Sequence, residues 1–376
     1  MQMAAHRLSM TQPEEAKDSA APNFEGSPLA HLRETIQSAA SSSEGDRLLV
    51  LTHRGPDPDA IGSLEGVRFL LERSLGIKAD IVTVGRIHRA ENLALVRALN
   101  LEFGDYEEVQ PEQYFGSLLV DTQPGFGHTV VPADIPLLGV LDHHVTPEGD
   151  AATSRVAHLD VRLGVGATST IVWDYIRESG LELDQTVATA LFCGIRYDTK
   201  DLSRNVSSLD EEAYYATFRQ ADRGVLPEIH NPPLPQRYYS ELHRALDLAS
   251  QHGPLVICLL GEVSHPEFVA EMADFFLRMR GASWVVVGGF VEEEGEYVIS
   301  LRTDQAFGNA YPLLQRVLGG EGSFGGHGHI SGGRIPIESA ADGEVEEIEE
   351  RIRTAALAVI GKDQDGETGP LERDLI

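Results

Sequence analysis

The alternation of short apolar runs with longer helical patterns is the feature that most constrains the fold of this chain. Strand-length apolar runs lie at 48–53, 79–85, 117–123 and 136–144. Segments with the apolar spacing of helices lie between or after them, at 61–76, 166–180 and 186–199. Strands that alternate with helices predict a parallel, doubly wound α/β sheet. A second set of helices and strands follows a proline-rich stretch, so we expect two α/β lobes.

The periodicity also suggests where the lobes begin and end. Residues 1–44 start with a polar, Pro/Ala/Ser-rich stretch and are expected to be a mostly disordered tail with a short helix. We expect the first lobe at 45–223, a linker at 224–239 where prolines cluster, and a smaller second lobe at 240–340. The acid-rich remainder, 341–376, is expected to form a solvated helix and a tail.

The charge balance excludes several classes of function. The 376 residues include 30 Lys and Arg against 59 Asp and Glu, a formal charge of −29. Such a surface repels polyanions, which argues against binding of long duplex DNA. The two cysteines cannot build a disulfide framework or a cysteine zinc site. Because no apolar stretch reaches the roughly 20 residues that span a bilayer and no signal peptide is visible, we expect a cytoplasmic protein with no membrane partner.

Acids and histidines follow several of the apolar runs directly. These residues are His53, Asp57 and Asp59 after the first run, Asp121 after another, Asp142, His143 and His144 after a third, and Asp198 at the end of a helical segment. Each residue alone is typical of a turn or a helix cap. Their joint placement points to one crevice at the carboxyl ends of the strands. Carboxylate and imidazole ligands without cysteine favour Mn²⁺, Fe²⁺ or Co²⁺, and two such ions can hold a phosphoryl group.

These segments resemble a known family. HRGPDPDAIGS at 53–63, VDTQ at 120–123, Asp142-His143-His144 and GIRYDT at 194–199 resemble the four ordered motifs of the DHH phosphoesterase superfamily. GGHGHISGG at 325–333 resembles the GGHxxAAG motif of the DHHA1 domain. The resemblance implies a Rossmann-like DHH catalytic domain at 45–223, a DHHA1 substrate-binding domain at 240–340 and a central cleft between them.

The resemblance also implies roles for individual residues. It implies two Mn²⁺ ions, with Mg²⁺ or Co²⁺ as substitutes. One ion would be held by His53 and Asp57, and the other by Asp59, His143 and Asp198. Asp121 would bridge the two ions. Catalytic roles would fall to Asp142, which would orient a ligand histidine, and to His144, which would face the substrate phosphate. A terminal phosphate or nucleotide would be bound by Arg302 and by the loop of Gly325, Gly326 and His327.

Within the superfamily the chain resembles the stand-alone nano-RNase (oligoribonuclease) and pAp-phosphatase branch. That branch implies hydrolysis of short oligonucleotides or pAp-type nucleotides by a metal-bridged hydroxide, and a homodimer is compatible with it. The acidity of the chain favours a short substrate, since a longer single strand needs an extended basic track. An inorganic pyrophosphatase-like enzyme, a cyclic-dinucleotide phosphodiesterase and a catalytically silent nucleotide-binding regulator stay open as alternatives. Pro58, Lys200 and Ile330 depart from the family motifs and leave the preferred substrate open.

Overall fold

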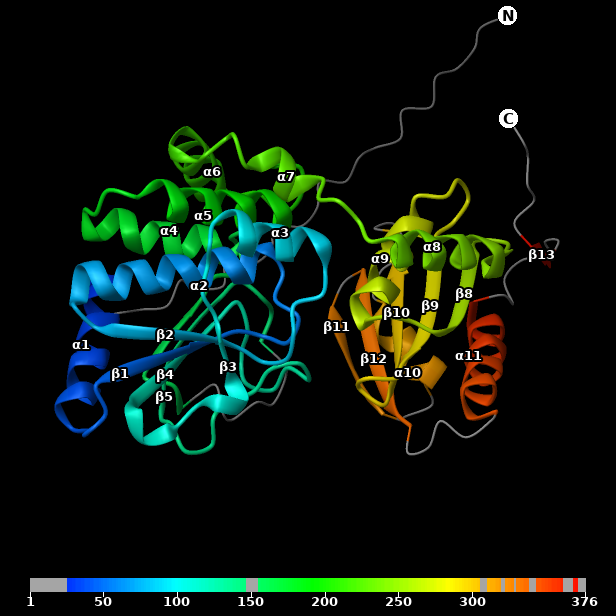
Figure 1. The fold of residues 1–376 in the computed structure, drawn as a ribbon, viewed down its shortest axis with the longest axis horizontal. Helices are drawn as coiled ribbons and strands as arrows, with labels where there is room; N and C mark the ends of the chain where they lie inside the picture. The colour runs from blue at the N-terminus through cyan, green and yellow to red at the C-terminus, as the bar shows by residue number, and fades with distance from the viewer. Residues whose placement is uncertain are drawn as a thin grey trace, which may run out of the picture.

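The computed structural model describes residues 26–146, 155–304, 310–318, 322–327, 329–337, 343–360 and 368–370. It contains two α/β lobes, each built around its own sheet (Figure 1). The predicted fold class is therefore confirmed. The predicted tail before residue 26 and most of the chain after residue 360 lie outside the described residues.

The sheet of the first lobe is parallel throughout, with the strand order β3-β2-β1-β4-β5-β6. Its strands are β1 Arg47–Leu51, β2 Lys78–Thr83, β3 Gly104–Asp105, β4 Tyr114–Val120, β5 Leu137–Asp142 and β6 His158–Val161. The chain runs outward from β1 through β3 and returns to place β4 beside β1. This reversal of strand order creates a switch point between β1 and β4, where ligands bind in open parallel sheets.

A helical layer covers the face of this sheet that lies uppermost in Figure 1. The helices of the lobe are α1 Pro28–Ser41, α2 Pro58–Leu70 with a π-helical continuation Leu71–Leu75, α3 Ala90–Ala98, α4 Thr168–Ser179, α5 Gln185–Asp198, α6 Ser208–Gln220 and α7 Leu226–His230. Helix α2 packs so closely against α4 and α5 that two of its glycines leave no room for a side chain. A Cβ on Gly62 would lie 2.5 Å from the Ala190 carbonyl oxygen, and a Cβ on Gly66 would lie 2.6 Å from Val172 Cγ1. This close packing fixes the start of α2 relative to the end of α5.

The first lobe extends beyond its expected bounds at both ends. Helix α1 is the short helix expected before residue 45, but Leu32 and Ile36 are fully buried, so it belongs to the main core of the lobe. Helix α7 occupies the start of the expected linker, with Leu226 and Ile229 buried against the first lobe. Only 231–235, rich in proline, separate α7 from the next helix. Apolar residues at helical spacing therefore outweigh the polar composition of both segments.

The second lobe has a seven-stranded sheet, antiparallel except for the pair β8–β9, in the order β11-β12-β10-β9-β8-β7-β13. Its strands are β7 Ser250–His252, β8 Leu255–Glu262, β9 Trp284–Val291, β10 Glu296–Thr303, β11 Ser323–His327, β12 Ile330–Pro336 and β13 Thr368–Pro370. One face packs against α8 Gln236–Leu248 and α9 Pro266–Leu277, and the other against α10 Tyr311–Leu318 and α11 Glu344–Ile360.

Two sequence expectations for this lobe are wrong. The acidic helix expected after residue 340 is present as α11, but it is not solvated on all sides, because Ile348, Ile352 and Ala356 form an apolar stripe buried against the sheet. The segment Gly325–Gly326–His327 was expected to be a loop but belongs to strand β11, where Gly325 pairs with Gly332 of β12. Glycine weakens a strand, so the pattern concealed this hairpin. No helix among the described residues is both long and apolar enough to cross a bilayer.

Candidate metal centre

The acids and histidines predicted as ligands meet at the switch point of the first sheet. His53 follows β1, Asp121 follows β4, His143 follows β5, and Asp198 ends α5. Their ligand atoms form three groups, each with its members within 4.8 Å of one another: His53/Asp57/Asp121, Asp59/His143/Asp198 and Asp121/His143/His144. Asp121 joins the first group to the third. The structure thus brings together all of the predicted ligands, and Asp121 belongs to two of the three groups.

The first motif places its two aspartates through a helix cap. Asp57 is the N-cap of α2, and its Oδ1 accepts hydrogen bonds from the backbone N–H groups of Asp59 (2.9 Å) and Ala60 (3.0 Å). Pro58 occupies the first position of the helix, where its missing N–H is not needed and its fixed φ suits the turn. The departure of Pro58 from the family motif therefore supports the cap that positions both carboxylates.

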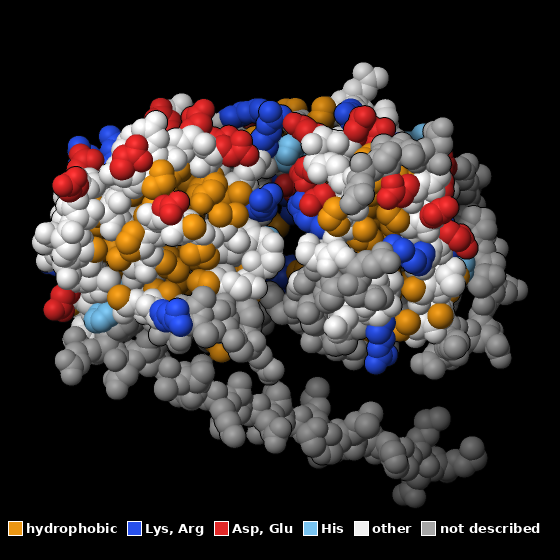
Figure 2. Space-filling model, turned by 90° about the horizontal axis from the view of Figure 1, so that it is seen from below, with side chains coloured by type: hydrophobic (Ala, Val, Ile, Leu, Met, Phe, Trp, Pro, Cys, Tyr) orange, Lys and Arg blue, Asp and Glu red, His pale blue; other side chains and the backbone are white. Residues whose placement is uncertain are grey.

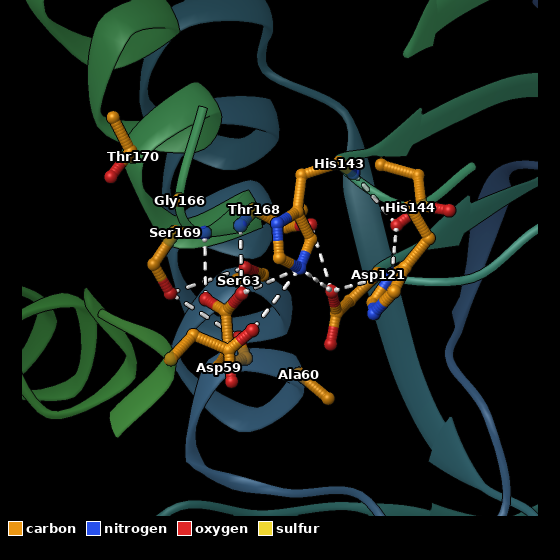
Figure 3. Close-up of polar contacts among 12 residues, drawn as sticks. Asp59, Ala60, Ser63, Asp121, His143, His144, Gly166, Thr168, Ser169 and Thr170 are labelled. Atoms are coloured by element: carbon orange, nitrogen blue, oxygen red, sulfur yellow. Dashed lines mark hydrogen bonds and ion pairs between the residues drawn. The ribbon is translucent and has the colours of Figure 1, made fainter. Parts of the chain in front are cut away.

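Helix α4 supplies contacts that the sequence did not reveal. The Asp59 carboxylate accepts hydrogen bonds from the backbone N–H groups of Thr168 (2.7 Å) and Ser169 (2.8 Å) at the start of α4 (Figure 3). The Thr168 hydroxyl donates to Asp121 Oδ1 at 2.8 Å. The positive end of the α4 dipole thus faces two buried carboxylates. The only sequence signal for this role is a Thr-Ser pair at the start of an apolar helical pattern.

His143 has the orientation of a metal ligand. Its Nδ1 lies 3.3 Å from the Val165 carbonyl oxygen and donates to it, so Nε2 is the ring atom that faces the carboxylates of the cluster. Nε2 is buried, makes no hydrogen bond and lies 3.1 Å from Asp198 Oδ2, 3.8 Å from Asp121 Oδ1 and 3.9 Å from Asp59 Oδ2. A buried nitrogen that points at three carboxylates without a hydrogen bond fits a shared cation.

The carboxylates of the cluster repel one another when no cation is bound. Burial, followed by the charge of Asp198, raises the pKa of Asp57 and raises that of Asp59 to about 7. Burial and the neighbouring aspartates raise the pKa of Asp121 well above its usual value. Burial lowers the pKa of His143, but contact with Asp198 outweighs it and raises the value to about 10. Several buried carboxylates with two imidazoles and no thiolate form a donor set suited to divalent cations such as Mn²⁺.

Asp142 and His144 form a second, linked unit. Asp142 Oδ1 accepts hydrogen bonds from the His143 backbone N–H and from His144 Nδ1, both at 2.8 Å, and Oδ2 accepts from Gln123 Nε2 at 2.8 Å. Burial opposes ionisation, but the contact with His144 lowers the pKa of Asp142 on balance. Asp142 thus orients a histidine as expected, but that histidine is His144, while Val165 holds the ligand His143. Gln123 is the last residue of the VDTQ motif, but the sequence assigned no role to it.

The predicted substrate-binding residues lie on the second lobe. Arg302 on β10 is 7% exposed, and its guanidinium donates to Asp274 Oδ1 and Ser300 Oγ, both at 2.7 Å. Gly325, Gly326 and His327 lie on β11, which shares the neighbouring strand β12 with β10. No hydrogen bond or ion pair found among the described residues joins Arg302 to the first-lobe cluster. Its role toward a phosphate stays a prediction.

Helix α9 contacts the first lobe beside the cluster. A Cβ on Gly55, in the loop before α2, would lie 3.0 Å from Glu267 Oε1. Arg89 donates to the Tyr197 hydroxyl at 2.8 Å and lies 3.8 Å from Glu271 Oε1, so it links the residue before Asp198 to the second lobe. Figure 2 shows a hollow between the two lobes with Lys and Arg side chains near its rim. The cluster is therefore close to the contact between the lobes.

Comparisons with curated proteins give partial matches, and no family model matches the chain. The uncharacterized protein MJ1633 of Methanocaldococcus jannaschii is 33% identical over 321 residues, which cover 84% of this chain and 64% of that protein. A probable manganese-dependent inorganic pyrophosphatase of Streptococcus thermophilus is 26% identical over 154 residues, which cover 41% of this chain and 48% of that protein. The chain thus spans less than two thirds of the length of these relatives.

A solved structure shows the fold. An exopolyphosphatase-related protein from Bacteroides fragilis superposes with a TM-score of 0.65 and 16% identity, and the match covers 88% of this chain and 97% of that one. Because the match covers nearly all of both chains, it includes both lobes. The chain therefore shares the two-lobed fold of that protein.

Proposed function

We propose that the protein is a metal-dependent phosphoesterase of the DHH type. The observation that carries the proposal is the cluster of buried and half-buried carboxylates and imidazoles at the switch point of the sheet, in which Asp121 belongs to two of the three candidate ligand groups. The buried Nε2 of His143, which faces three carboxylates, supports a cation in this cluster. The partial likeness to a protein named a manganese-dependent pyrophosphatase, together with the fold of an exopolyphosphatase-related protein, agrees with phosphate chemistry.

The ligands divide between two sites. His53, Asp57 and Asp121 would hold one divalent ion, and Asp59, His143 and Asp198 the other. Asp121 would be shared, because its Oδ1 lies 3.8 Å from His143 Nε2 of the second group. We propose Mn²⁺ for both sites, with Mg²⁺ or Co²⁺ as substitutes. Bound divalent ions supply two effects, polarisation of phosphoryl oxygens and a lower pKa for a nearby water.

The chain's own residues then position and protonate the substrate. Asp142 holds Nδ1–H of His144, so Nε2 is the ring atom directed away from that carboxylate. A charged His144 would donate from Nε2 to a phosphoryl or leaving-group oxygen, and the ionised Asp142 would stabilise that charge. Thr168 holds Asp121 in place through its hydroxyl, and the α4 N-terminus favours the ionised form of Asp59.

Among phosphoesters we propose short oligonucleotides and pAp-type nucleotides as substrates. The formal charge of −29 disfavours long nucleic acids, whereas a small substrate needs only local positive charge. Arg302 and the strand Gly325–His327 would bind its terminal phosphate from the second lobe. A cytoplasmic location and the absence of membrane and duplex DNA partners belong to the same proposal. Inorganic pyrophosphate is a second candidate, favoured by the likeness to the named pyrophosphatase over 41% of the chain.

An Mn²⁺-supplemented hydrolysis assay tests the proposal. It compares pAp, RNA of two to five nucleotides, pyrophosphate, and linear and cyclic dinucleotides. We expect hydrolysis of the short RNA or pAp, and loss of that activity in Asp121→Ala. Asp247→Ala, which removes a partly exposed carboxylate on α8, serves as the matched control. Hydrolysis of pyrophosphate alone would replace the nucleotide substrate, and tight nucleotide binding without any hydrolysis would favour a regulator.

A further inference from the structure

Two aromatic rings complete a closed circle of side chains around one side of the metal centre. Phe126 and His128 lie nearly parallel, with ring centroids 5.7 Å apart and an interplanar angle of 11°. Phe126 also meets the His144 ring edge-on at 6.1 Å, and His128 meets the His53 ring edge-on at 5.2 Å. His53 and His144 in turn lie 3.7 and 3.8 Å from the two oxygens of Asp121. The Phe126–His128 pair therefore stands opposite Asp121.

The loop that carries the pair is anchored at both ends. Gln123 Nε2 donates to Asp142 Oδ2 and to the His144 carbonyl oxygen, both at 2.8 Å. At the other end, the Arg54 backbone N–H donates to the His128 carbonyl oxygen at 2.9 Å. Between these anchors, Gly125 turns the chain with a φ of +90°, which only glycine adopts readily. The two rings are thus held in place before any ligand arrives, which lowers the entropic cost of binding.

Neither Phe126 nor His128 is a candidate metal ligand. Phe126 has no ligand atom, and His128 belongs to none of the ligand groups found among the described residues. His128 is exposed and Phe126 is half-buried, although both lie next to rings of the cluster. The faces of the two rings carry no hydrogen-bond donor for an inorganic phosphate group. A flat aromatic surface does suit a nucleobase, which every nucleotide carries and which stacks on aromatic side chains with little sequence preference.

We propose that Phe126 and His128 form a stacking platform for a nucleobase of the substrate, and that this platform makes the site prefer nucleotides to inorganic phosphates. The inference rests on the proposed phosphoesterase function, because it places the base next to the phosphate bound at the cluster. The platform selects for the presence of a base and not for its identity, since stacking uses the ring faces that all bases share.

Equilibrium binding of two small probes tests the platform independently of hydrolysis. Adenosine 5′-monophosphate and ribose 5-phosphate share the sugar and the phosphate and differ only in the base. Calorimetry with Mn²⁺ should show tighter binding of the nucleotide by the wild type. Phe126→Ala and Phe126→Leu should weaken nucleotide binding by about 5- to 150-fold, the effect of losing one stacked base, and leave ribose 5-phosphate unchanged. Phe126→Trp should restore the preference, because it returns an aromatic face.

Matched controls separate the platform from the fold and from the catalytic proposal. Tyr239→Ala removes a ring that is 58% exposed on α8 and should leave both affinities unchanged. Equal loss of both probes in Phe126→Leu would overturn the platform, because the loop would then only support the cluster. A wild type that binds both probes equally would also overturn it, even if phosphoesters are hydrolysed. Base-dependent binding without hydrolysis of any phosphoester would keep the platform and refute the phosphoesterase.

Discussion

Asp59→Asn should make the metal-free protein more stable at neutral pH and should reduce the stabilisation that added metal gives. Asp59 is fully buried and shares the cluster with Asp198, so its pKa rises from 3.8 to about 7 when no cation is bound. A rise of this size corresponds to about 4 kcal/mol of unfolding free energy, since one pKa unit is worth about 1.4 kcal/mol. The amide of asparagine carries no charge and escapes this penalty.

The direction in which the stability changes with pH follows from the number of protons bound in each state. Between pH 3.8 and about 7 the folded chain keeps a proton on Asp59 that the unfolded chain has lost. The contribution of Asp59 to stability therefore falls as the pH rises through this window, and the full penalty is present above pH 7. At low pH the variant is the less stable protein by about 1–2 kcal/mol, because an amide cannot accept both N–H groups at the start of α4. The difference should reverse in favour of the variant as the pH rises.

Urea unfolding with a metal chelator, repeated from pH 4.5 to 7.5, measures this difference. The chain has two tryptophans, and Trp284→Phe leaves Trp173 on α4 as a fluorescent probe of the first lobe alone. Because this probe reports on one lobe, its unfolding transition can be analysed separately from that of the second lobe. Mn²⁺ should then stabilise the protein that keeps Asp59 more than the Asp59→Asn variant, which retains the group of His53, Asp57 and Asp121 but lacks a carboxylate of the other group. A stability difference that stays flat across the pH range refutes the electrostatic reasoning, and Asp247→Asn supplies the control.

Three further changes test other parts of the structure. Thr168→Val removes the hydrogen bond to Asp121 without changing the shape of the side chain. In a metal titration the affinity for Mn²⁺ should fall about 10- to 100-fold, the usual effect of losing a hydrogen-bond partner of a metal ligand. Thr168→Ser keeps the hydroxyl and should keep the affinity. His158 is buried, and burial lowers its pKa to about 4, so the protein should lose about 3 kcal/mol of stability as the pH falls from 6.5 to 4. A pH titration of His158→Phe should lack that loss, and an equal loss in the variant would contradict the assignment. Arg302→Ala should weaken binding of substrates with a terminal phosphate, and an unchanged apparent affinity would remove Arg302 from the site.

The sequence predicted the residues of the cluster because each one sits in a local motif. His53, Asp121 and His143 directly follow apolar runs, and the topology of a parallel sheet brings such positions to one edge. The supporting contacts could not be predicted in the same way. Thr168 reaches Asp59 across 109 residues of chain, through a backbone N–H that any residue type except proline carries. Which helix start faces which carboxylate is decided by packing.

The fold was predictable where patterns were long and apolar. Strands β1, β2, β4 and β5 were visible as apolar runs, whereas β3 has only two residues, Gly104 and Asp105, and β6 alternates polar and apolar residues over four positions. The hairpin of β11 and β12 is rich in glycine, which carries no side-chain pattern to identify a strand. The acid-rich composition of α11 predicted a solvated helix, but two of its isoleucines, Ile348 and Ile352, are buried.

The excess of acidic charge and the metal centre act at different ranges. At physiological ionic strength the Debye length is about 8 Å, so the formal charge of −29 acts mainly on ligands long enough to lie along the surface. Inside the cluster, the carboxylates are buried or half-buried and poorly screened, and two divalent ions would offset their charge. A small phosphate ester bound there gains from the short-range contacts, while a long polyanion that extends beyond the hollow meets the acidic surface. Stacking on Phe126 and His128 adds affinity without adding positive charge, so it suits a site on such an acidic protein.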